Sequence, residues 1–197
     1  MVHTTILEVR KEIEESSSTK RRAPVVENMN QLISKENDCF KCKGHCCTFE
    51  FNSMQVTPLE TFDIYDYLLK KEMITPELIT RLEKNIQHFR LDKDFLSLGK
   101  KSFRRYYTCP FYLEDKLGCS IGKNNKPYGC LAFNPKEKDV TVPGHCTSYT
   151  NSLEVREEEN RDDEAKLNEY LKKKLSLYWD KKDISTSVLY LIKMFKT

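Results

Sequence analysis

The sequence contains no apolar run near the roughly 20 residues that a membrane-spanning helix needs. Its first residues also lack the basic segment and the following apolar segment of a signal peptide. We therefore expect a cytoplasmic protein with no membrane partner. Neither sign of charge is in large excess, because the sequence has 33 lysines and arginines and 30 aspartates and glutamates. This balance does not favour nucleic acid as a partner, since nucleic-acid-binding proteins usually present a strongly basic surface.

Motifs for common enzyme chemistry are also missing. Glycine is scarce, at 6 of 197 residues, and no G-x-G-x-x-G loop is present. A Rossmann-type methyltransferase or dehydrogenase is therefore not expected. The hydrolase nucleophile elbow and the H-E-x-x-H zinc motif are absent as well. No local motif assigns catalysis, so whether the protein is an enzyme stays open.

The apolar content is sufficient for one domain, because 39% of the residues are hydrophobic and 11% are aromatic. We predict a mainly α fold: a small cysteine-cluster domain with a helical hairpin, an irregular metal-stapled region, and helical N- and C-terminal arms. The predicted division is an N-terminal helical arm and linker over 1–38, a cysteine-cluster metal-binding domain over 39–150, and a C-terminal helical hairpin over 151–197.

The central hairpin has the clearest helix signals. Thr57 is a suitable N-cap, Pro58 suits the first helical position, and Glu60 completes a capping box. Thr75 and the proline after it start a second helix in the same way. We expect helices over 58–71 and 76–90. Their predicted apolar faces consist of Phe62, Tyr65, Leu68 and Leu69 in the first helix, and Leu78, Ile79, Leu82, Ile86 and Phe89 in the second.

Both arms show helical periodicity. At the N-terminus we predict helices over 4–15 and about 25–35, joined by a linker that contains Lys20-Arg21-Arg22 and Pro24. At the C-terminus we predict helices over 162–179 and 183–195, with Asp183 as the cap that separates them. Their predicted apolar faces consist of Leu167, Leu171, Leu175 and Tyr178, and then Val188, Leu189, Leu191, Ile192 and Phe195. These faces should pack on the cysteine-cluster domain or on a partner protein.

The eight cysteines are the feature of the composition that says most about function. In a reducing cytosol, patterned cysteines indicate metal ligands before disulfides. In the first block, C-x2-C-x3-C-C, the short spacing lets two sulfurs face one metal and Gly44 permits a sharp bend. The second block has nine, ten and fifteen residues between its cysteines. The predicted metal ligands are Cys39, Cys42, Cys46, Cys47, Cys109, Cys119, Cys130 and Cys146.

Two kinds of metal group fit eight thiols. Two zinc sites of four thiolates are one option, and a [4Fe-4S] cluster with or without a second cluster is the other. Zinc modules usually offer paired C-x2-C knuckles, whereas the second block offers single cysteines, so the two options are near even. Adjacent side chains diverge, so we expect that Cys46 and Cys47 do not ligate the same mononuclear ion. One of them should complete a site with second-block cysteines and staple the two halves of the domain across the helical hairpin. The region 95–142 has only short strand-like pieces at 103–108 and 140–142, so it needs more than an apolar core to hold it.

The residues around these cysteines carry a resemblance. The second block lies in Cys109-Pro110-Phe111-Tyr112-Leu113, Gly118-Cys119-Ser120-Ile121 and Lys126-Pro127-Tyr128-Gly129-Cys130-Leu131-Ala132-Phe133-Asn134-Pro135. Together with the first block and Cys146, this pattern over 39–146 resembles the YkgJ-type cysteine cluster family, which is described as a zinc- or iron-chelating domain. This chain has Lys126 and Leu131 where the family commonly has arginines. The resemblance implies metal binding and, because flagellin lysine methylases contain a similar cluster, more distantly methyl transfer.

Two functional classes follow. In the first, the metal stabilises a binding or accessory module whose helical arms engage a protein partner. The alternative is an iron-sulfur enzyme that modifies a protein side chain, with a lysine methylase-like activity as an example. That alternative predicts an open metal position beside a pocket, and the candidate lining consists of Tyr106, Tyr107, Phe111, Tyr112 and Tyr128.

Two further patterns have simpler explanations. His45 and His145 each precede a cysteine of the set, and we expect both to point away from the metal. The run 100–107 alternates cations with aromatic residues, as single-strand nucleic acid platforms do. We expect an edge strand there whose aromatic side chains turn inward.

Overall fold

A computed structural model describes residues 2–13, 17–32, 44–93, 104–116, 118–135, 146–148 and 150–196. Helices dominate these residues, which confirms the mainly α prediction. The helices are α1 (Val2–Ile13), α2 (Ser18–Leu32), α3 (Pro58–Lys70), α4 (Pro76–Phe89), α5 (Tyr128–Leu131), α6 (Thr150–Lys174) and α7 (Ile184–Lys196), with 3-10 turns at His45–Cys47 and Lys123–Asn125. Two small antiparallel sheets pair β1 (Gln55–Val56) with β4 (Lys182–Asp183), and β2 (Phe133–Pro135) with β3 (Cys146–Ser148).

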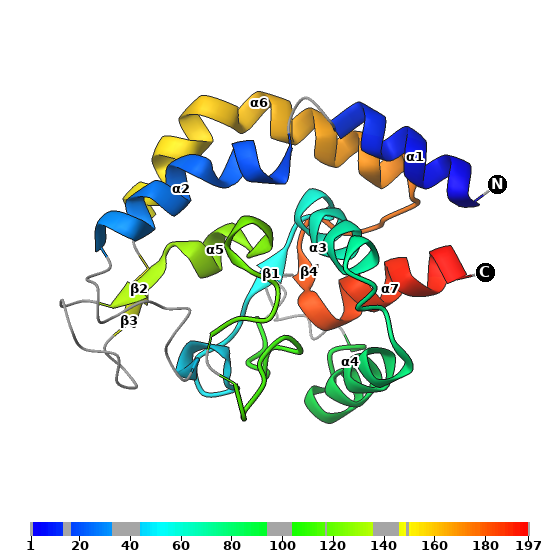
Figure 1. Cartoon of the computed structure of the whole chain (residues 1–197), viewed down its shortest axis with the longest axis horizontal. Helices are drawn as coiled ribbons and strands as arrows, with labels where there is room; N and C mark the ends of the chain where they lie inside the picture. Colours follow the sequence, from blue (N-terminus) through cyan, green and yellow to red (C-terminus); the bar gives the residue numbers. More distant parts are fainter. Residues whose placement is uncertain are drawn as a thin grey trace, which may run out of the picture.

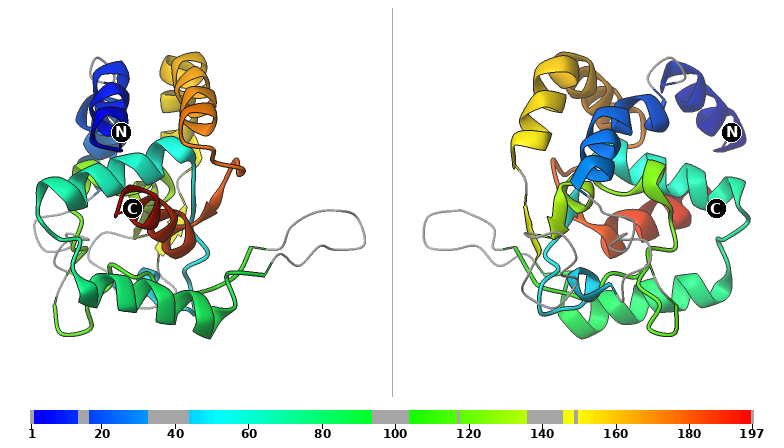
Figure 2. Two further views of the ribbon diagram at one scale, coloured as in Figure 1. Left: turned by 90° about the vertical axis from the view of Figure 1, so that its right-hand side faces the viewer. Right: turned by 60° about the vertical axis from the view of Figure 1, so that its left-hand side comes forward.

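The helices form layers around α3 and α7. Helices α1, α2 and α6 lie on one side of this central pair, and α4 lies on the other (Figures 1 and 2). The centre of the core joins side chains that are at most 1% exposed, namely Leu68, Leu82, Val188, Leu191 and Ile192. The predicted packing of the C-terminal segment on the rest of the chain is therefore confirmed for α7.

The central hairpin forms as predicted. The Thr57 hydroxyl accepts the Glu60 N–H at 3.2 Å, and the Glu60 carboxylate accepts the Thr57 N–H at 2.9 Å, which completes the capping box. The Thr75 hydroxyl accepts the Leu78 N–H at 3.3 Å at the start of α4. The assignment of Leu69 to the buried face is wrong, because this side chain is 36% exposed.

The C-terminal helices are separated at the predicted position, but with different bounds. The Asp183 carboxylate accepts the Thr186 N–H at 2.8 Å and so caps α7. Helix α6 begins at Thr150 rather than near 162, since its charged first half consists largely of good helix formers that carry no apolar period. It ends at Lys174 rather than 179, and Tyr178 is 71% exposed instead of facing the core.

The predicted linker in the N-terminal arm is wrong. Helix α2 begins at Ser18, includes Pro24, and contains Arg21 and Arg22 in buried positions. Charged side chains are seldom buried unless they are paired, and both arginines pair with Asp63. A local helix-breaking pattern is thus overridden by a tertiary contact.

The strand expected over 103–108 is also wrong for the residues that the structure describes, because residues 104–108 are irregular. The piece at 140–142 lies outside the described residues, as do Cys39, Cys42 and His145. The three-segment division of the chain stays a prediction.

No helix in the described ranges is both long enough and apolar enough to cross a bilayer. This finding agrees with the sequence, which contains no long apolar run.

Candidate functional site

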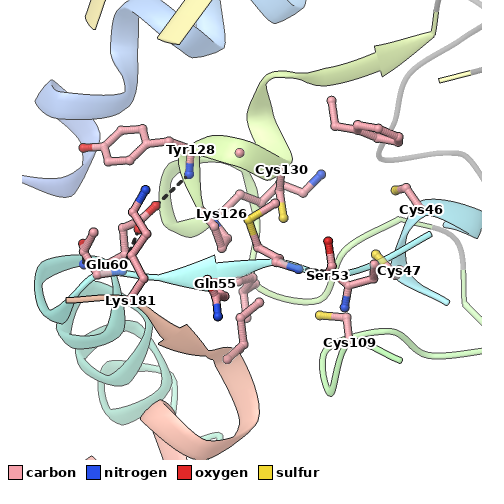
Figure 3. A pocket seen from close by; sticks show the side chains of 18 of the residues that line it. Cys46, Cys47, Ser53, Gln55, Glu60, Cys109, Lys126, Tyr128, Cys130 and Lys181 are labelled. Carbon is pink, nitrogen blue, oxygen red and sulfur yellow. Dashed lines mark hydrogen bonds between the residues drawn. The ribbon is translucent and has the colours of Figure 1, made fainter. Parts of the chain in front are cut away.

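Cysteines from both blocks line one cavity of about 580 Å³. Figure 3 shows Cys46, Cys47 and Cys109 at one end of it, Cys130 nearer the middle, and Glu60, Tyr128 and Lys181 towards the other end. The cysteines in the lining are Cys46, Cys47, Cys109, Cys119 and Cys130. Cys146 is not among the lining residues and pairs with Pro135 between β3 and β2. Six of the eight predicted ligands lie in the described residues, and the structure brings five of these six together.

The two blocks meet through the backbone. The Cys109 N–H donates to the Cys47 carbonyl at 2.7 Å. Next to this contact, the Tyr107 N–H donates to the Asn52 carbonyl at 2.9 Å and the Asn52 amide donates back to the Tyr107 carbonyl at 2.8 Å. Asn52 is buried, so this reciprocal pair holds the loop after the first block against the segment that leads into the second. The predicted meeting of the blocks is seen for Cys47 and Cys109.

A glycine makes the first block compact. Gly44 has φ of 68°, in the left-handed region where residues with a Cβ are strained, and it precedes the turn His45–Cys47. A Cβ at Gly44 would also lie 3.2 Å from the Tyr112 ring. The bend expected from the sequence is confirmed, and it directs the chain towards Cys46 and Cys47.

The second block is held by short local contacts. The Cys130 N–H donates to the Pro127 carbonyl at 2.9 Å within the single turn α5. A Cβ at Gly129 would lie 2.7 Å from the Met54 methyl carbon, so glycine lets this turn approach the cavity wall closely. The Ser120 hydroxyl donates to the Phe111 carbonyl at 2.9 Å and fixes the residue next to Cys119.

The cysteine thiols that line the cavity favour their protonated forms. A hydrogen bond from the Cys46 thiol to Cys47, followed by burial, raises the pKa of Cys46. A hydrogen bond to Cys109 likewise raises the pKa of Cys47. Burial raises the pKa of Cys130 and of Cys119, and the nearby charge of Lys126 opposes both shifts. A metal bound here would displace thiol protons, so its affinity would depend on pH.

The donor set fits a thiophilic metal in chemistry, since thiolates bind zinc and iron-sulfur clusters. In the described part of the chain, no group of three or more His, Cys, Asp or Glu side chains is arranged to hold a metal ion. Cys39 and Cys42 are outside that part. The fit therefore rests on donor type and on convergence into one cavity.

A buried ionic cluster supports the cavity wall from behind. Arg21 Nη2 lies 2.6 Å and Arg22 Nη1 lies 2.8 Å from the two oxygens of Asp63, and all three side chains are at most 2% exposed. Arg22 Nε donates to the Lys126 carbonyl at 2.8 Å. Helix α2 is thereby tied to the segment that carries Cys130, so the N-terminal arm contributes to the site. The sequence showed only a basic run at these positions.

Tyr128 connects this cluster to two buried carboxylates. Its hydroxyl accepts from Arg21 at 3.3 Å and donates to Glu164 at 2.7 Å. Its backbone N–H donates to Glu60 Oε1 at 2.9 Å. Glu60 thus has two roles, because it caps α3 and also fixes the turn before Cys130. Only the first role has a local sequence signal.

The predicted aromatic lining is mostly wrong. Of the five candidates only Tyr128 lines the cavity. Tyr107 and Phe111 belong to the core, where the Tyr107 hydroxyl donates to the Met54 carbonyl at 2.5 Å and accepts the Ile184 N–H at 3.1 Å. Tyr106 is 59% exposed. His45 is not a lining residue, and no observation tests its predicted orientation relative to a metal.

Comparison with known proteins adds no relative. No family model matches the sequence, and neither a curated protein nor a solved structure matches it. The likeness to the YkgJ-type family stays a resemblance of motifs.

Proposed function

We propose that the protein binds zinc or an iron-sulfur cluster through thiolates of both cysteine blocks and acts as a binding or accessory module. The observation that carries this proposal is the meeting of Cys47 with Cys109 in a cavity wall that also contains Cys46, Cys119 and Cys130. Cysteine thiols gathered from distant parts of a chain are typical of metal ligands. The remaining members of the proposed ligand set are Cys39, Cys42 and Cys146.

The local electrostatics support a thiolate-bound metal. Several thiolates around one ion leave a net negative charge, which is costly to bury without a counter-charge. Lys126 is 7% exposed, and its charge acts on Cys46, Cys119 and Cys130. The ammonium group would offset part of that negative charge. The protein partner of the module would bind through the helical arms.

A second candidate is an iron-sulfur enzyme that modifies a protein side chain. One observation favours it: a cavity of about 580 Å³ beside the thiols falls within the range that holds small ligands or substrate groups. A module that only stabilises the fold has no need for this space. The choice between the two candidates depends on which metal is bound.

Anaerobic purification followed by metal analysis and a visible absorption spectrum tests the proposal. We expect zinc without colour, or iron and sulfide with a visible absorption band. Zinc would support the module and remove the enzyme candidate, whereas a cluster would keep both candidates. Protein that carries neither metal, although purified without oxygen and without chelators, would refute metal binding.

A further inference from the structure

The end of the cavity away from the sulfur atoms carries two charges of opposite sign. Glu60, which is buried, and Lys181, which is exposed, both line it, and Figure 3 shows them on the side opposite Cys46, Cys47 and Cys109. The β1–β4 register pairs Val56 with Lys182, and Thr57 and Lys181 are the next residues of the two chains at that end of the ladder. Thr57 in turn donates its N–H to Glu60. The strand register and the capping box therefore bring this carboxylate and this ammonium to the same end of the cavity.

Neither charge is neutralised by the other. Within the described part of the chain, no ion pair joins Glu60 or Lys181 to an oppositely charged side chain. Glu60 is only 5% exposed, and each of its oxygens accepts one backbone N–H. A carboxylate has about four acceptor positions, so further positions remain for a donor from a ligand. A buried carboxylate without a counter-charge is energetically unfavourable, and a bound ammonium would relieve that cost.

The rest of the lining limits the chemistry of the ligand. The lining side chains include three cations, Arg104, Lys126 and Lys181, and two carboxylates, Glu60 and Glu164. A simple amine would pair with Glu60 but would leave Lys181 without an anion. Met54 and Ile184 supply apolar lining to the same cavity.

We propose that the cavity binds a free α-amino acid with an apolar side chain. Its ammonium lies at Glu60, its carboxylate lies at Lys181, and its side chain extends along Met54 and Ile184 towards the cysteines. An α-amino acid is the simplest ligand that carries both charges on adjacent groups. This inference goes beyond the proposed function, since the two charges are in place whether or not a metal is bound.

Isothermal titration calorimetry on the full-length protein tests this site with three matched probes. L-norleucine carries both charges, hexanoate lacks the ammonium, and pentylamine lacks the carboxylate. We expect norleucine to bind at least ~10-fold more tightly than either of the others, because each loses one charged hydrogen-bonding group. Equal binding of hexanoate and norleucine would show a simple anion site and overturn the proposal. Absence of norleucine binding would also overturn it.

Two variants assign the charges. Lys181→Gln should reduce norleucine affinity to the level of pentylamine, whereas Lys173→Gln, at an exposed position of α6 outside the cavity lining, should leave it unchanged. Glu60→Gln should reduce norleucine affinity to the level of hexanoate. If Glu60→Gln does not fold, the comparison of Lys181→Gln with Lys173→Gln decides. Undiminished norleucine binding in Lys181→Gln would contradict the proposal. Metal content measured on the same samples separates this result from the fate of the proposed metal site.

Discussion

Replacing Asp63 with asparagine removes the carboxylate that neutralises two buried arginines. Its oxygens lie 2.6 Å from Arg21 Nη2 and 2.8 Å from Arg22 Nη1, and the three side chains are at most 2% exposed. Asparagine keeps the shape and one acceptor but not the charge. Two guanidinium groups would then remain in the interior with their main counter-charge gone.

Breaking a buried ion pair in this way typically costs ~3–5 kcal/mol. Because one acceptor oxygen remains, we expect the lower part of that range. In a protein of this size, 1 kcal/mol corresponds to ~2–4 °C in melting temperature, so Asp63→Asn should lower it by about 6–12 °C. The loss should also loosen the attachment of α2 to the segment that carries Cys130, since Arg22 holds the Lys126 carbonyl.

Asp66 offers a matched control on the same helix. It also faces two cations, with Arg10 at 2.5 Å and Lys70 at 2.6 Å, but these pairs lie near the surface. Exposed pairs contribute only ~0–1 kcal/mol. Chemical denaturation followed by circular dichroism should therefore show a much larger loss for Asp63→Asn than for Asp66→Asn. If the two variants lose the same free energy of unfolding within about 1 kcal/mol, then burial does not make the Asp63 cluster more stabilising than the surface pairs of Asp66.

Three further perturbations test other parts of the structure. Tyr128→Phe removes the hydroxyl between Arg21 and Glu164 and should lower the free energy of unfolding by ~1–3 kcal/mol in urea denaturation; a change near zero would contradict the role given to this hydroxyl. Burial raises the pKa of Asp183 above its ordinary value of 3.8. The stability that this residue contributes in its neutral form is therefore complete below pH 3.8, and it is lost as the pH rises through the raised pKa. Asp183→Asn should therefore gain stability relative to the native protein between about pH 3 and pH 7 in thermal melts, and parallel pH profiles would refute this. Chelation of the metal should increase hydrogen exchange over 104–135 while α3 and α4 keep their protection, and unchanged exchange would count against coupling between metal and fold.

Local signals predicted the helices well, and long-range pairings explain the failures. Thr57, Glu60 and Thr75 mark helix starts through contacts within one turn, so the sequence alone predicts them. Arg21 and Arg22 instead depend on Asp63, which is 42 and 41 residues away in the chain. The same two arginines would be a solvated basic run in a protein without that carboxylate. Their burial therefore could not be predicted from neighbouring residues.

The candidate site divides in the same way. The convergence of the cysteines was predictable because their number and spacing already indicated a common ligand. The opposite end of the cavity had no such signal. Glu60 was fully explained by its capping role, and Lys181 is exposed, as residues of such a charged stretch ordinarily are, so nothing local marked it as a residue of the cavity. Only the β1–β4 register brings these two residues to one end of the cavity.

The most direct test of the central claim is the metal content per chain of single variants from each cysteine block, purified without oxygen. Cys47→Ser and Cys109→Ser should each lose most of the bound metal, because the two residues meet in one cavity wall. Met54→Leu removes a sulfur from the same wall that is not a proposed ligand, and it should retain the metal. Full metal content in either cysteine variant, with circular dichroism like that of the native protein, would contradict a site shared between the two blocks.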